Sequence, residues 1–570
     1  MIQKSLTTLL FCLILYTTAA AQNIIVSRYY PDDVFRYPLD LPPSTAGSFG
    51  EMRPNHFHSG LDFKTNQRIG YPLYAVFDGF VSRVRIQYGG FGRAIYITHP
   101  NGYTSVYGHL ERFSPEIERI VHAYQYQKQS YEVDFNPLAF QVPVYKGQQF
   151  GIAGNAGASA GPHLHFEVRD TKTEETINPQ LFGLTIPDKV PPTILSIGVY
   201  HLDGAPFNEK TKKEFLAVTG AGSSYRLARA QTLQLSGQIG FALTGHDMNS
   251  VSPNRNGIYQ IELKLDGTTV YTYAIERFAF DQTRAINAYI DYPAFLTSGR
   301  WMQKCFVPPG SKATIYPQAI DRGIINFNDD ALHEVEYVIK DVAGNTSTLL
   351  LKVQSKAAVQ TPFKPAGILF KYDNVNVFNN DKIKVTIDPG NLYDDLDFNY
   401  ARLPRKPGAY SETHRIHNKF TPLHDNFSLW IKPDSTIGRY AGKAVIINTA
   451  GNVAAGVYED GYVKGQCRFF GDYYLRVDTV PPVITPINIK DGANLKTVKT
   501  ISLKLSDNLS GIKSYAGKID GKWVLVEHDY KSKQFRYFFD ADINTGKHTF
   551  EMTVIDNEDN TSHFTANFYR

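Results

Sequence analysis

Cysteine is scarce in this chain: three occur among 570 residues. Cys12 lies in an apolar run near the start of the sequence, and Cys305 and Cys467 are far from each other. Two distant cysteines do not make the disulfide framework that stabilises small secreted domains. Because cysteine is among the most buried residue types, we expect Cys305 and Cys467 to be buried free thiols.

An excess of charge of one sign is also missing. Lysine and arginine together number 59 and aspartate and glutamate 55, which gives a formal net charge of +4. This balance argues against a strongly basic surface, and we expect no nucleic acid partner.

Long apolar runs are absent beyond the first residues. The run from Leu6 to Tyr16 follows Lys4 and precedes three alanines that end at Ala21, which is the order of a secretory signal. It is shorter than the roughly 20 residues that cross a bilayer. We therefore expect residues 1–21 to be a signal peptide, the mature chain to be exported, and no membrane span to remain after its removal.

Aromatic residues, in contrast, are abundant, with 36 Tyr and 36 Phe. They favour β-structure, and the length of the chain predicts several domains. Asp78-Gly79 and Asn101-Gly102 stand between β-rich runs and indicate hairpin turns. We expect a mainly β protein that begins with an antiparallel-sheet domain over residues 22–187.

The remainder of the chain repeats itself loosely. Val-Pro-Pro-Thr-Ile at 190–194 recurs as Val-Pro-Pro-Val-Ile at 480–484, and each copy predicts the start of a module. The segments that begin at Asp341 and Asp556 follow β-rich runs and indicate hairpin turns near module ends. We predict three β modules, an immunoglobulin-like sandwich at each end and a β-rich module between them. Their ranges are 188–357, 358–478 and 479–570.

An insertion at residues 111–144 interrupts the β pattern of the first domain. Ser114 and Pro115, followed by acidic residues, form the pattern of a helix start, so we predict a short helix. A long insertion near a site is either a lid or surface decoration. We hypothesise that its tyrosines shape one wall of a substrate groove: Tyr124, Tyr126 and Tyr131.

The segment His163-Leu164-His165 is the most informative part of the chain. Side chains alternate along a strand, so His163, His165 and Glu167 should share one face. The apolar residues between them should point into the core: Leu164, Phe166 and Val168. Two imidazoles aimed at one place, with a further histidine and a carboxylate nearby, supply the donors that a catalytic zinc ion prefers. This pattern predicts a hydrolytic metal site.

Two upstream segments supply further candidates. His58 and Asp62 are four residues apart, but Gly60 between them argues against a helix and predicts a loop that runs into a strand. His109 lies at the end of the predicted strand 104–110, where we expect it to share a face with Tyr107.

Together, a His-x-x-x-Asp at 58–62, a Tyr-Gly-His-Leu at 107–110 and a Gly-Pro-His-Leu-His-Phe-Glu-Val at 161–168 resemble the motifs of the M23 (lysostaphin-like, LytM-type) zinc metallopeptidases. The resemblance covers residues 48–182 and implies a lysostaphin-like peptidase fold. It also implies one zinc ion per chain, with His58, Asp62 and His165 as ligands and His109 and His163 as catalytic histidines. Three protein ligands leave coordination positions free for water and substrate.

The activity that this resemblance implies is hydrolysis of peptide bonds in peptidoglycan cross-links, in the periplasm or cell envelope of a Gram-negative bacterium. Peptidoglycan peptides would be the substrate, and the β modules would be available to envelope protein partners. Two other functions stay open: a non-catalytic LytM-like factor that binds peptidoglycan or activates a cell-wall amidase, and an adhesin or scaffold built on the β modules. His163→Ala separates them, because only a peptidase loses its function.

Other polar residues near the motifs have less specific interpretations. His56 is open to three roles: a competing ligand, a residue of the groove wall, or polar surface. Glu167 is suited either to a hydrogen bond with a ligand histidine or to an exposed salt bridge. Four histidines outside the motifs are expected to be structural: His99, His122, His201 and His246.

Overall fold

The computed structural model describes residues 24–357, 363–539 and 543–570. The signal peptide predicted over residues 1–21 lies outside these ranges. Among the helices that the model describes, none combines the length and the apolar character needed to cross a membrane.

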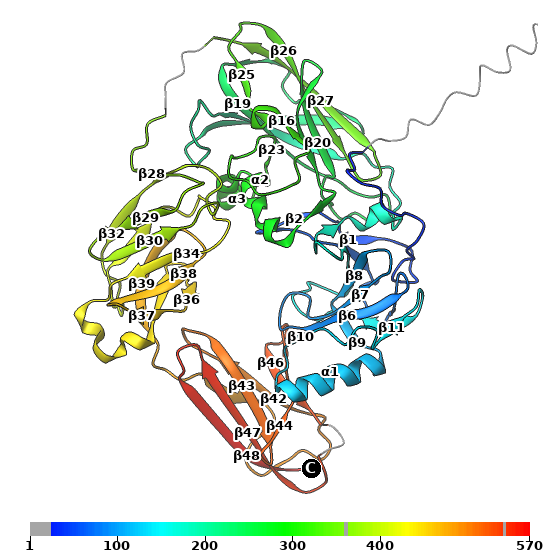
Figure 1. Cartoon of the computed structure of the whole chain (residues 1–570), viewed down its shortest axis with the longest axis vertical. Helices are drawn as coiled ribbons and strands as arrows, with labels where there is room; N and C mark the ends of the chain where they lie inside the picture. Colours follow the sequence, from blue (N-terminus) through cyan, green and yellow to red (C-terminus); the bar gives the residue numbers. More distant parts are fainter. Residues whose placement is uncertain (1–23, 358–362, 540–542) are drawn as a thin grey trace, which may run out of the picture.

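The chain follows a ring (Figure 1). An N-terminal domain leads into a first β module, two further β modules continue the ring, and the last one returns to the N-terminal domain. Nearly all regular elements are strands, which confirms the prediction of a mainly β protein.

The N-terminal domain is built on an antiparallel sheet. Its strands lie side by side in the order β1 (Thr45–Gly47), β4 (Leu61–Lys64), β13 (His163–Asp170), β8 (Tyr103–Gly108), β7 (Arg93–Thr98), β6 (Gly79–Ile86) and β10 (Val133–Phe135). Two short strands extend it: β11 (Pro143–Val144) pairs with β6, and β14 (Thr176–Ile177) pairs with β13. A second sheet shares the same core: β5 (Pro72–Tyr74), β12 (Gln149–Ala153) and β9 (Leu110–Phe113).

Strand β13 shows the predicted alternation. Leu164, Phe166 and Val168 are fully buried in the core of the domain, while His165 and Glu167 lie on the opposite face. Burial of three apolar side chains on one face fixes the register of β13, because a slip by one residue would exchange the two faces. The core therefore determines where the histidines lie.

The insertion contains helix α1 (Pro115–Lys128), with Ser114 at its N-cap and Pro115 in the first turn. This confirms the predicted helix. Ile117 and Val121 are buried in the core of the domain, so α1 is attached through its apolar face.

The first β module follows the N-terminal domain. Its strands lie in the order β23 (Gln303–Lys304), β19 (Gly237–His246), β15 (Thr193–His201), β16 (Lys212–Ala221), β17 (Ser224–Leu227), β27 (Thr346–Ser355), β26 (Leu332–Lys340), β20 (Gln260–Leu265), β21 (Thr268–Ala274) and β24 (Gln318–Ala319). Further short elements are β18 (Thr232–Leu235), which pairs with β27, β25 (Ile325–Phe327), which pairs with β19, and the helices α2 (Ile286–Tyr289) and α3 (Tyr292–Ser298).

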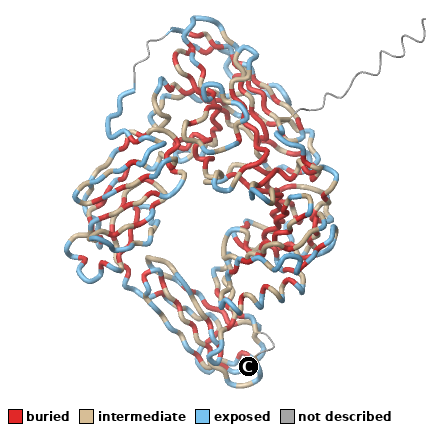
Figure 2. The backbone as a smooth tube through the Cα atoms, viewed as in Figure 1, coloured by how far each residue is buried: buried red, intermediate tan, exposed pale blue. Residues whose placement is uncertain are grey.

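The core of the first β module is continuous with that of the N-terminal domain. Strand β22 (Arg277–Phe278) of the module pairs with β14 of the domain. The ring of Phe278 packs against Phe49 and Phe57, with centroid distances of 5.3 and 5.8 Å. Figure 2 shows buried segments on both sides of this junction. The two parts therefore form one packed body.

The middle module contains two larger sheets and one small one. The first larger sheet has the order β29 (Asn376–Asn379), β30 (Ile383–Ile387), β34 (Phe427–Ile431), β38 (Tyr462–Cys467) and β37 (Val457–Glu459). The second has the order β32 (Tyr400–Leu403), β33 (Thr413–Ile416), β39 (Gly471–Val477), β35 (Ala444–Asn448) and β36 (Val453–Ala454). The small sheet pairs β28 (Ile368–Phe370) with β31 (Leu396–Phe398).

The last module has two sheets around one core. One has the order β40 (Val483–Pro486), β42 (Thr500–Ser506), β46 (Gln534–Phe538) and β45 (Val526–Asp529). The other has the order β41 (Ala493–Asn494), β48 (Thr561–Tyr569), β47 (Lys547–Asp556), β43 (Ile512–Ile519) and β44 (Lys522–Val524). Both cysteines of the described chain, Cys305 and Cys467, are buried free thiols, as predicted.

The ring is closed by contacts between the last module and the N-terminal domain. His528 stacks on Tyr88 with ring centroids 3.7 Å apart, and Trp523 packs edge-on against Tyr126 of α1 at 5.0 Å. Lys531 of the β45–β46 hairpin donates a hydrogen bond to the carbonyl oxygen of Asn155. The last module therefore rests on the insertion and on nearby loops of the N-terminal domain.

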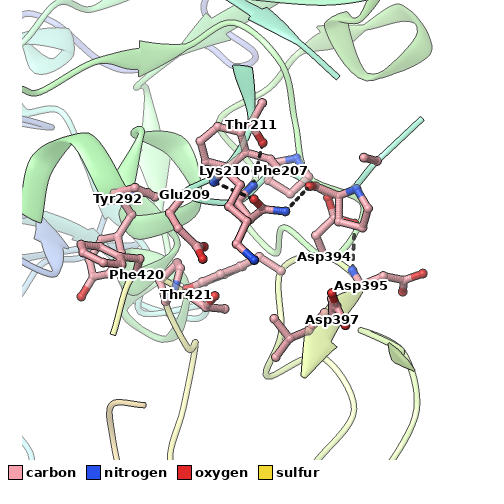
Figure 3. Close-up of a pocket in the computed structure, with 18 of the residues that line it drawn as sticks. Phe207, Glu209, Lys210, Thr211, Tyr292, Asp394, Asp395, Asp397, Phe420 and Thr421 are labelled. Atoms are coloured by element: carbon pink, nitrogen blue, oxygen red, sulfur yellow. Dashed lines mark hydrogen bonds between the residues drawn. The ribbon is translucent and has the colours of Figure 1, made fainter. Parts of the chain in front are cut away.

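A cavity of about 390 Å³ lies between the first and the middle β modules. Phe207 and Lys210 line it from the first module and Asp394 and Phe420 from the middle one, as Figure 3 shows. The cavity separates the two modules along part of their junction.

Candidate metal centre

Asp62 and His165 face each other on neighbouring strands. In the pairing of β4 with β13, Asp62 lies directly opposite His165. Side chains at directly opposed positions of an antiparallel pair lie close together on the same face. The register of the sheet thus brings a carboxylate and an imidazole together from positions far apart in the sequence.

His58 approaches the same place from a loop. It follows the short hairpin of β2 (Met52–Arg53) and β3 (His56–Phe57) and precedes β4. This confirms the predicted loop that runs into a strand. A Cβ atom at Gly60 would lie 2.3 Å from the carbonyl oxygen of Phe166, so only glycine fits where this loop meets β13.

Three potential ligand atoms converge at this point. His58 Nε2 lies 3.0 Å from Asp62 Oδ1 and 3.1 Å from His165 Nδ1, and His165 Nδ1 lies 2.9 Å from Asp62 Oδ1. All three residues are buried. The structure therefore brings together the three residues that the resemblance implied as zinc ligands.

The outer nitrogens of the two ligand candidates are held by fixed acceptors. His58 Nδ1 lies 2.7 Å from the carbonyl oxygen of Ser48, and His165 Nε2 lies 2.9 Å from Glu167 Oε1. Since these oxygens accept, the outer nitrogens donate, and His58 Nε2 and His165 Nδ1 are the nitrogens that face Asp62. Glu167 thus makes the expected hydrogen bond to a histidine, and its second oxygen forms a salt bridge with Arg169 (2.6 Å) that is buried, not exposed.

His109 and His163 are oriented in the same way. His109 Nδ1 lies 2.8 Å from the carbonyl oxygen of Ala156, and His163 Nδ1 lies 2.8 Å from that of Gly161. Their rings are 4.7 Å apart, and His163 Nε2 lies 3.4 Å from Asp62 Oδ1. The Nε2 atoms are thus left for chemistry beside the three converging donors. We call these five residues the histidine centre: His58, Asp62, His109, His163 and His165.

The backbone at His109 is left-handed, with φ of 62°. This residue separates β8 from β9 and interrupts the alternation of side chains. Tyr107 consequently points into the core, where its hydroxyl oxygen accepts a hydrogen bond from the Val76 amide (3.1 Å). The prediction that Tyr107 and His109 share a face was wrong, because it assumed an unbroken strand. Such strained backbone conformations cluster at active sites.

The charges of the centre favour a cation among the donors. Burial opposes the ionisation of Asp62, yet His58 and the hydrogen bonds from His163 and His165 hold its pKa well below the usual range. Burial also disfavours a charged His165, but its hydrogen bonds to Asp62 and Glu167 raise its pKa to about 9. A metal ion bound by Asp62 and His165 would replace the proton that His165 Nδ1 shares with Asp62 Oδ1.

Sequence reasoning missed the residues that support the centre. Arg53 Nη2 donates to Asp62 Oδ2 (2.7 Å), which leaves Oδ1 for the histidines. The ring of Phe91 stacks on His165 with centroids 4.7 Å apart. A Cβ atom at Gly47 would lie 2.5 Å from Arg53 Nη2, so a side chain there would displace the guanidinium group from its place beside Asp62. The position of Arg53, five residues before His58, was the one sequence signal for this arginine, and no local pattern indicated Phe91 or Gly47.

The remaining histidines and the insertion tyrosines lie elsewhere. His56 is exposed and bonded to the Pro54 carbonyl oxygen (3.0 Å), whereas His99 is buried between Asp78 and Ser105, as a structural residue should be. Two of the tyrosines thought to line a groove face the last module instead: Tyr126 contacts Trp523, and Tyr131 lines a cavity together with Trp523 and Tyr515.

The comparisons with known proteins agree with this geometry. Residues 56–126 match the model of peptidase family M23, which includes His58, Asp62 and His109. The chain contains an M23 peptidase domain. Residues 368–478, in the middle module, match the model of the Zu5-like domain.

Several relatives share the M23 region. A protein of Haemophilus influenzae named as an uncharacterized metalloprotease is 33% identical over 141 residues, 23% of this chain and 24% of its own length. The DD-carboxypeptidase/endopeptidase Mpg of Neisseria meningitidis is 30% identical over 131 residues, again 23% and 24%. The peptidoglycan DD-endopeptidase ShyA of Vibrio cholerae is 30% identical over 139 residues, 23% and 26%. The chain thus spans about a quarter of the length of these relatives.

Proposed function

We propose that the M23 domain is a zinc-dependent endopeptidase that hydrolyses peptide bonds in peptidoglycan cross-links. The observation that carries the proposal is the convergence of His58 Nε2, Asp62 Oδ1 and His165 Nδ1 within 4.8 Å. In this proposal these three residues hold one zinc ion, and His109 and His163 are the catalytic histidines. The names of the relatives from Neisseria and Vibrio support peptidoglycan as the substrate.

The donor set suits zinc. Two imidazole nitrogens and one carboxylate oxygen are ligands that zinc prefers, and three protein ligands are typical of catalytic sites. Hydrogen bonds from the outer nitrogens to Ser48 and Glu167 fix the tautomers that ligation needs. Zinc in such a site supplies Lewis-acid chemistry, which polarises the scissile carbonyl and acidifies water.

His109 and His163 are suited to proton transfer. Burial and the neighbouring His165 and His163 lower the pKa of His109 to about 3, so its Nε2 is unprotonated near neutral pH. Either Nε2 can accept the proton that the attacking water loses and, once protonated, donate it to the leaving amine nitrogen. Phe91, which stacks on His165, supplies an apolar wall that excludes bulk water from one side of the centre.

The proposed organisation of the whole chain follows from the sequence. A signal peptide (1–21) precedes the peptidase domain (22–187, with the insertion 111–144), an immunoglobulin-like sandwich (188–357), a β-rich module (358–478) and a second sandwich (479–570). In this proposal the protein is exported to the periplasm or cell envelope of a Gram-negative bacterium. Its β modules are available to envelope protein partners.

Incubation of the mature protein with defined muropeptides, followed by product identification by mass, tests the proposed activity. We expect cleavage of cross-linked dimers into monomers, and no cleavage by His163→Ala. A non-catalytic factor that binds peptidoglycan or activates an amidase would leave the dimers intact and would keep its binding or activating function in the variant. That result would contradict the proposal.

A further inference from the structure

A second group of potential metal ligands lies in the first β module. Asp188, Asp247 and Asp341, here called the aspartate cluster, each place a carboxylate oxygen within 4.8 Å of the others. Asp247 and Asp341 are 5% and 1% exposed. Burial and the neighbouring Asp341 and Asp188 carboxylates raise the pKa of Asp247 to about 8. Like charges gathered in a buried place destabilise one another unless a cation lies among them.

Two asparagines beside the aspartate cluster have side-chain oxygens without a partner. Asn249 and Asn256 are 7% and 6% exposed, and among the described residues their Oδ1 atoms have no hydrogen-bond partner. Asn249 Nδ2 donates to Thr45 Oγ1 (2.9 Å), which leaves its Oδ1 on the other side of the amide. Both asparagines line one cavity of about 30 Å³ together with Asp188 and Asp247. Buried acceptors without partners are rare, so these oxygens point to a missing ligand.

The fold assembles the aspartate cluster at the end of a strand pair. Asp188 lies shortly before β15 and accepts a hydrogen bond from the Val190 amide (2.9 Å). Thr193, the first residue of β15, pairs with His246, the last residue of β19. Asp247, which follows His246, therefore lies beside the start of β15. Asp341 directly follows β26 and is held by the Asn345 side chain (2.7 Å). Each aspartate therefore occupies a fixed backbone position.

Asp478, which directly precedes the last module, repeats this arrangement with Asp507 and Asp556 of that module. Asp478 accepts from the Val480 amide (3.2 Å), and Asp556 accepts from the Asn560 side chain (2.7 Å), as their counterparts do. In this copy, however, Lys443 Nζ donates to Asn560 Oδ1 (2.9 Å), so a protein cation already lies nearby. Buried oxygens without a partner among the described residues occur in both copies, at Asp247, Asn249 and Asn256 in the first and at Asp507 and Ser510 in the last.

We propose that Asp188, Asp247 and Asp341, together with Asn249, bind one calcium ion. Every donor is oxygen, and calcium takes carboxylate and amide oxygens in flexible geometry. Magnesium suits the cluster less well, because it retains several waters and needs near-ideal octahedral geometry. The inference does not depend on the proposed peptidase function.

The calcium site would fix the junction between the first β module and the peptidase domain. The loop after Asp247 contacts β1 and Ser48, the residue that follows β1. Ser252 Oγ donates to the Thr45 carbonyl oxygen (3.2 Å), and the Gly257 amide donates to Ser48 Oγ (2.9 Å). Ser48 is also the residue whose carbonyl oxygen orients His58. An ion bound to this loop therefore stabilises a support of the histidine centre.

Calorimetric titration of the full mature chain with calcium chloride, after calcium removal, tests the proposal. We expect the wild type to bind one more calcium ion per chain than Asp247→Asn, with Kd on the order of 10⁻³ M or tighter. At a hundred times Kd, calcium should raise the Tm of the wild type by about 5–10 °C. The exposed Asp373→Asn should behave as the wild type, since Asp373 lies in the middle module.

The calcium-free form gives a second readout. Asp247→Asn replaces a carboxyl group whose ionisation is disfavoured by burial and by its acidic neighbours, so without calcium the variant should melt at or above the temperature of the wild type, which also shows that it folds. If that variant does not fold, the less buried Asp188→Asn should show the same loss of one bound ion. Equal calcium binding by wild type and folded variant, no binding up to about 10 mM, or a preference for magnesium would each overturn the proposal.

Discussion

The histidine centre and the aspartate cluster both bring three metal-ligating side chains within 4.8 Å, but from different donors. The histidine centre offers two imidazole nitrogens and one carboxylate oxygen, while the aspartate cluster offers oxygen alone. Nitrogen-containing sets suit zinc, and all-oxygen sets suit calcium. Donor chemistry, rather than the number of ligands, therefore distinguishes the proposed zinc site from the proposed calcium site.

The surroundings of the two sites differ as well. In the histidine centre the outer nitrogens of His58 and His165 bind fixed acceptors, so both rings are oriented before any metal arrives. In the aspartate cluster the oxygens of Asn249 and Asn256 have no partner among the described residues. We expect the first site to be preorganised and the second to gain order from its ion.

Loss of a donor from the histidine centre is expected to have the largest effect. His58→Ala or Asp62→Ala removes one of three protein ligands and should abolish zinc binding and muropeptide cleavage together. Metal analysis by mass spectrometry and a cleavage assay on the same preparations check this. Asp373→Asn serves as the folded control. Full activity in either ligand variant would contradict the assignment of the histidine centre as the zinc site.

Substitution of His109 should divide metal binding from turnover. His109 lies outside the ligand set, so His109→Ala should keep one zinc ion per chain while cleavage falls by about 10²-fold or more, since a proton-transfer group is lost. Zinc content and initial rates measured side by side show this split. Loss of zinc in the variant would assign His109 to the ligands instead.

A change at Glu167 should weaken the centre without destroying it. Glu167→Gln keeps the shape of the side chain but removes the charge that holds His165, and should lower zinc affinity by about 10- to 100-fold. Competition with a zinc-binding dye measures the affinity. Cleavage should recover at saturating zinc, and a loss that zinc does not restore would indicate a damaged fold.

The smallest expected effect is the change in stability when calcium alone is added to the metal-free protein. Calcium added to zinc-free protein should raise the Tm by about 5–10 °C at a hundred times Kd, and should restore no cleavage. Zinc should restore cleavage and leave the calcium-dependent shift in place. Thermal unfolding and cleavage measured after each addition test this, and restoration of cleavage by calcium alone would end the distinction.

The sequence predicted the parts of the histidine centre that depend on local periodicity. The alternation along residues 163–168 placed His163, His165 and Glu167 correctly, because buried apolar side chains fix the register of the strand. The same rule failed at His109, where a left-handed residue breaks the strand and turns Tyr107 into the core. Periodicity does not reveal such single-residue conformations.

Features that depend on tertiary contacts were not visible in the sequence. Arg53 supports Asp62, and Ser48 orients His58, through hydrogen bonds that only the folded chain defines. The segment at Asp341 was interpreted as a hairpin turn, and nothing local connected it with Asp188 or Asp247. The pairing of β15 with β19 brings Asp188 close to Asp247, and the end of β26 places Asp341 beside them. These strand positions are set by the packing of the whole module.

The most direct test of the central claim is an anomalous diffraction measurement at the zinc absorption edge on crystals of the mature protein. We predict one zinc peak, about 2.0–2.2 Å from His58 Nε2, Asp62 Oδ1 and His165 Nδ1. No peak in zinc-supplemented crystals, or a peak bound by a different set of residues, would contradict it.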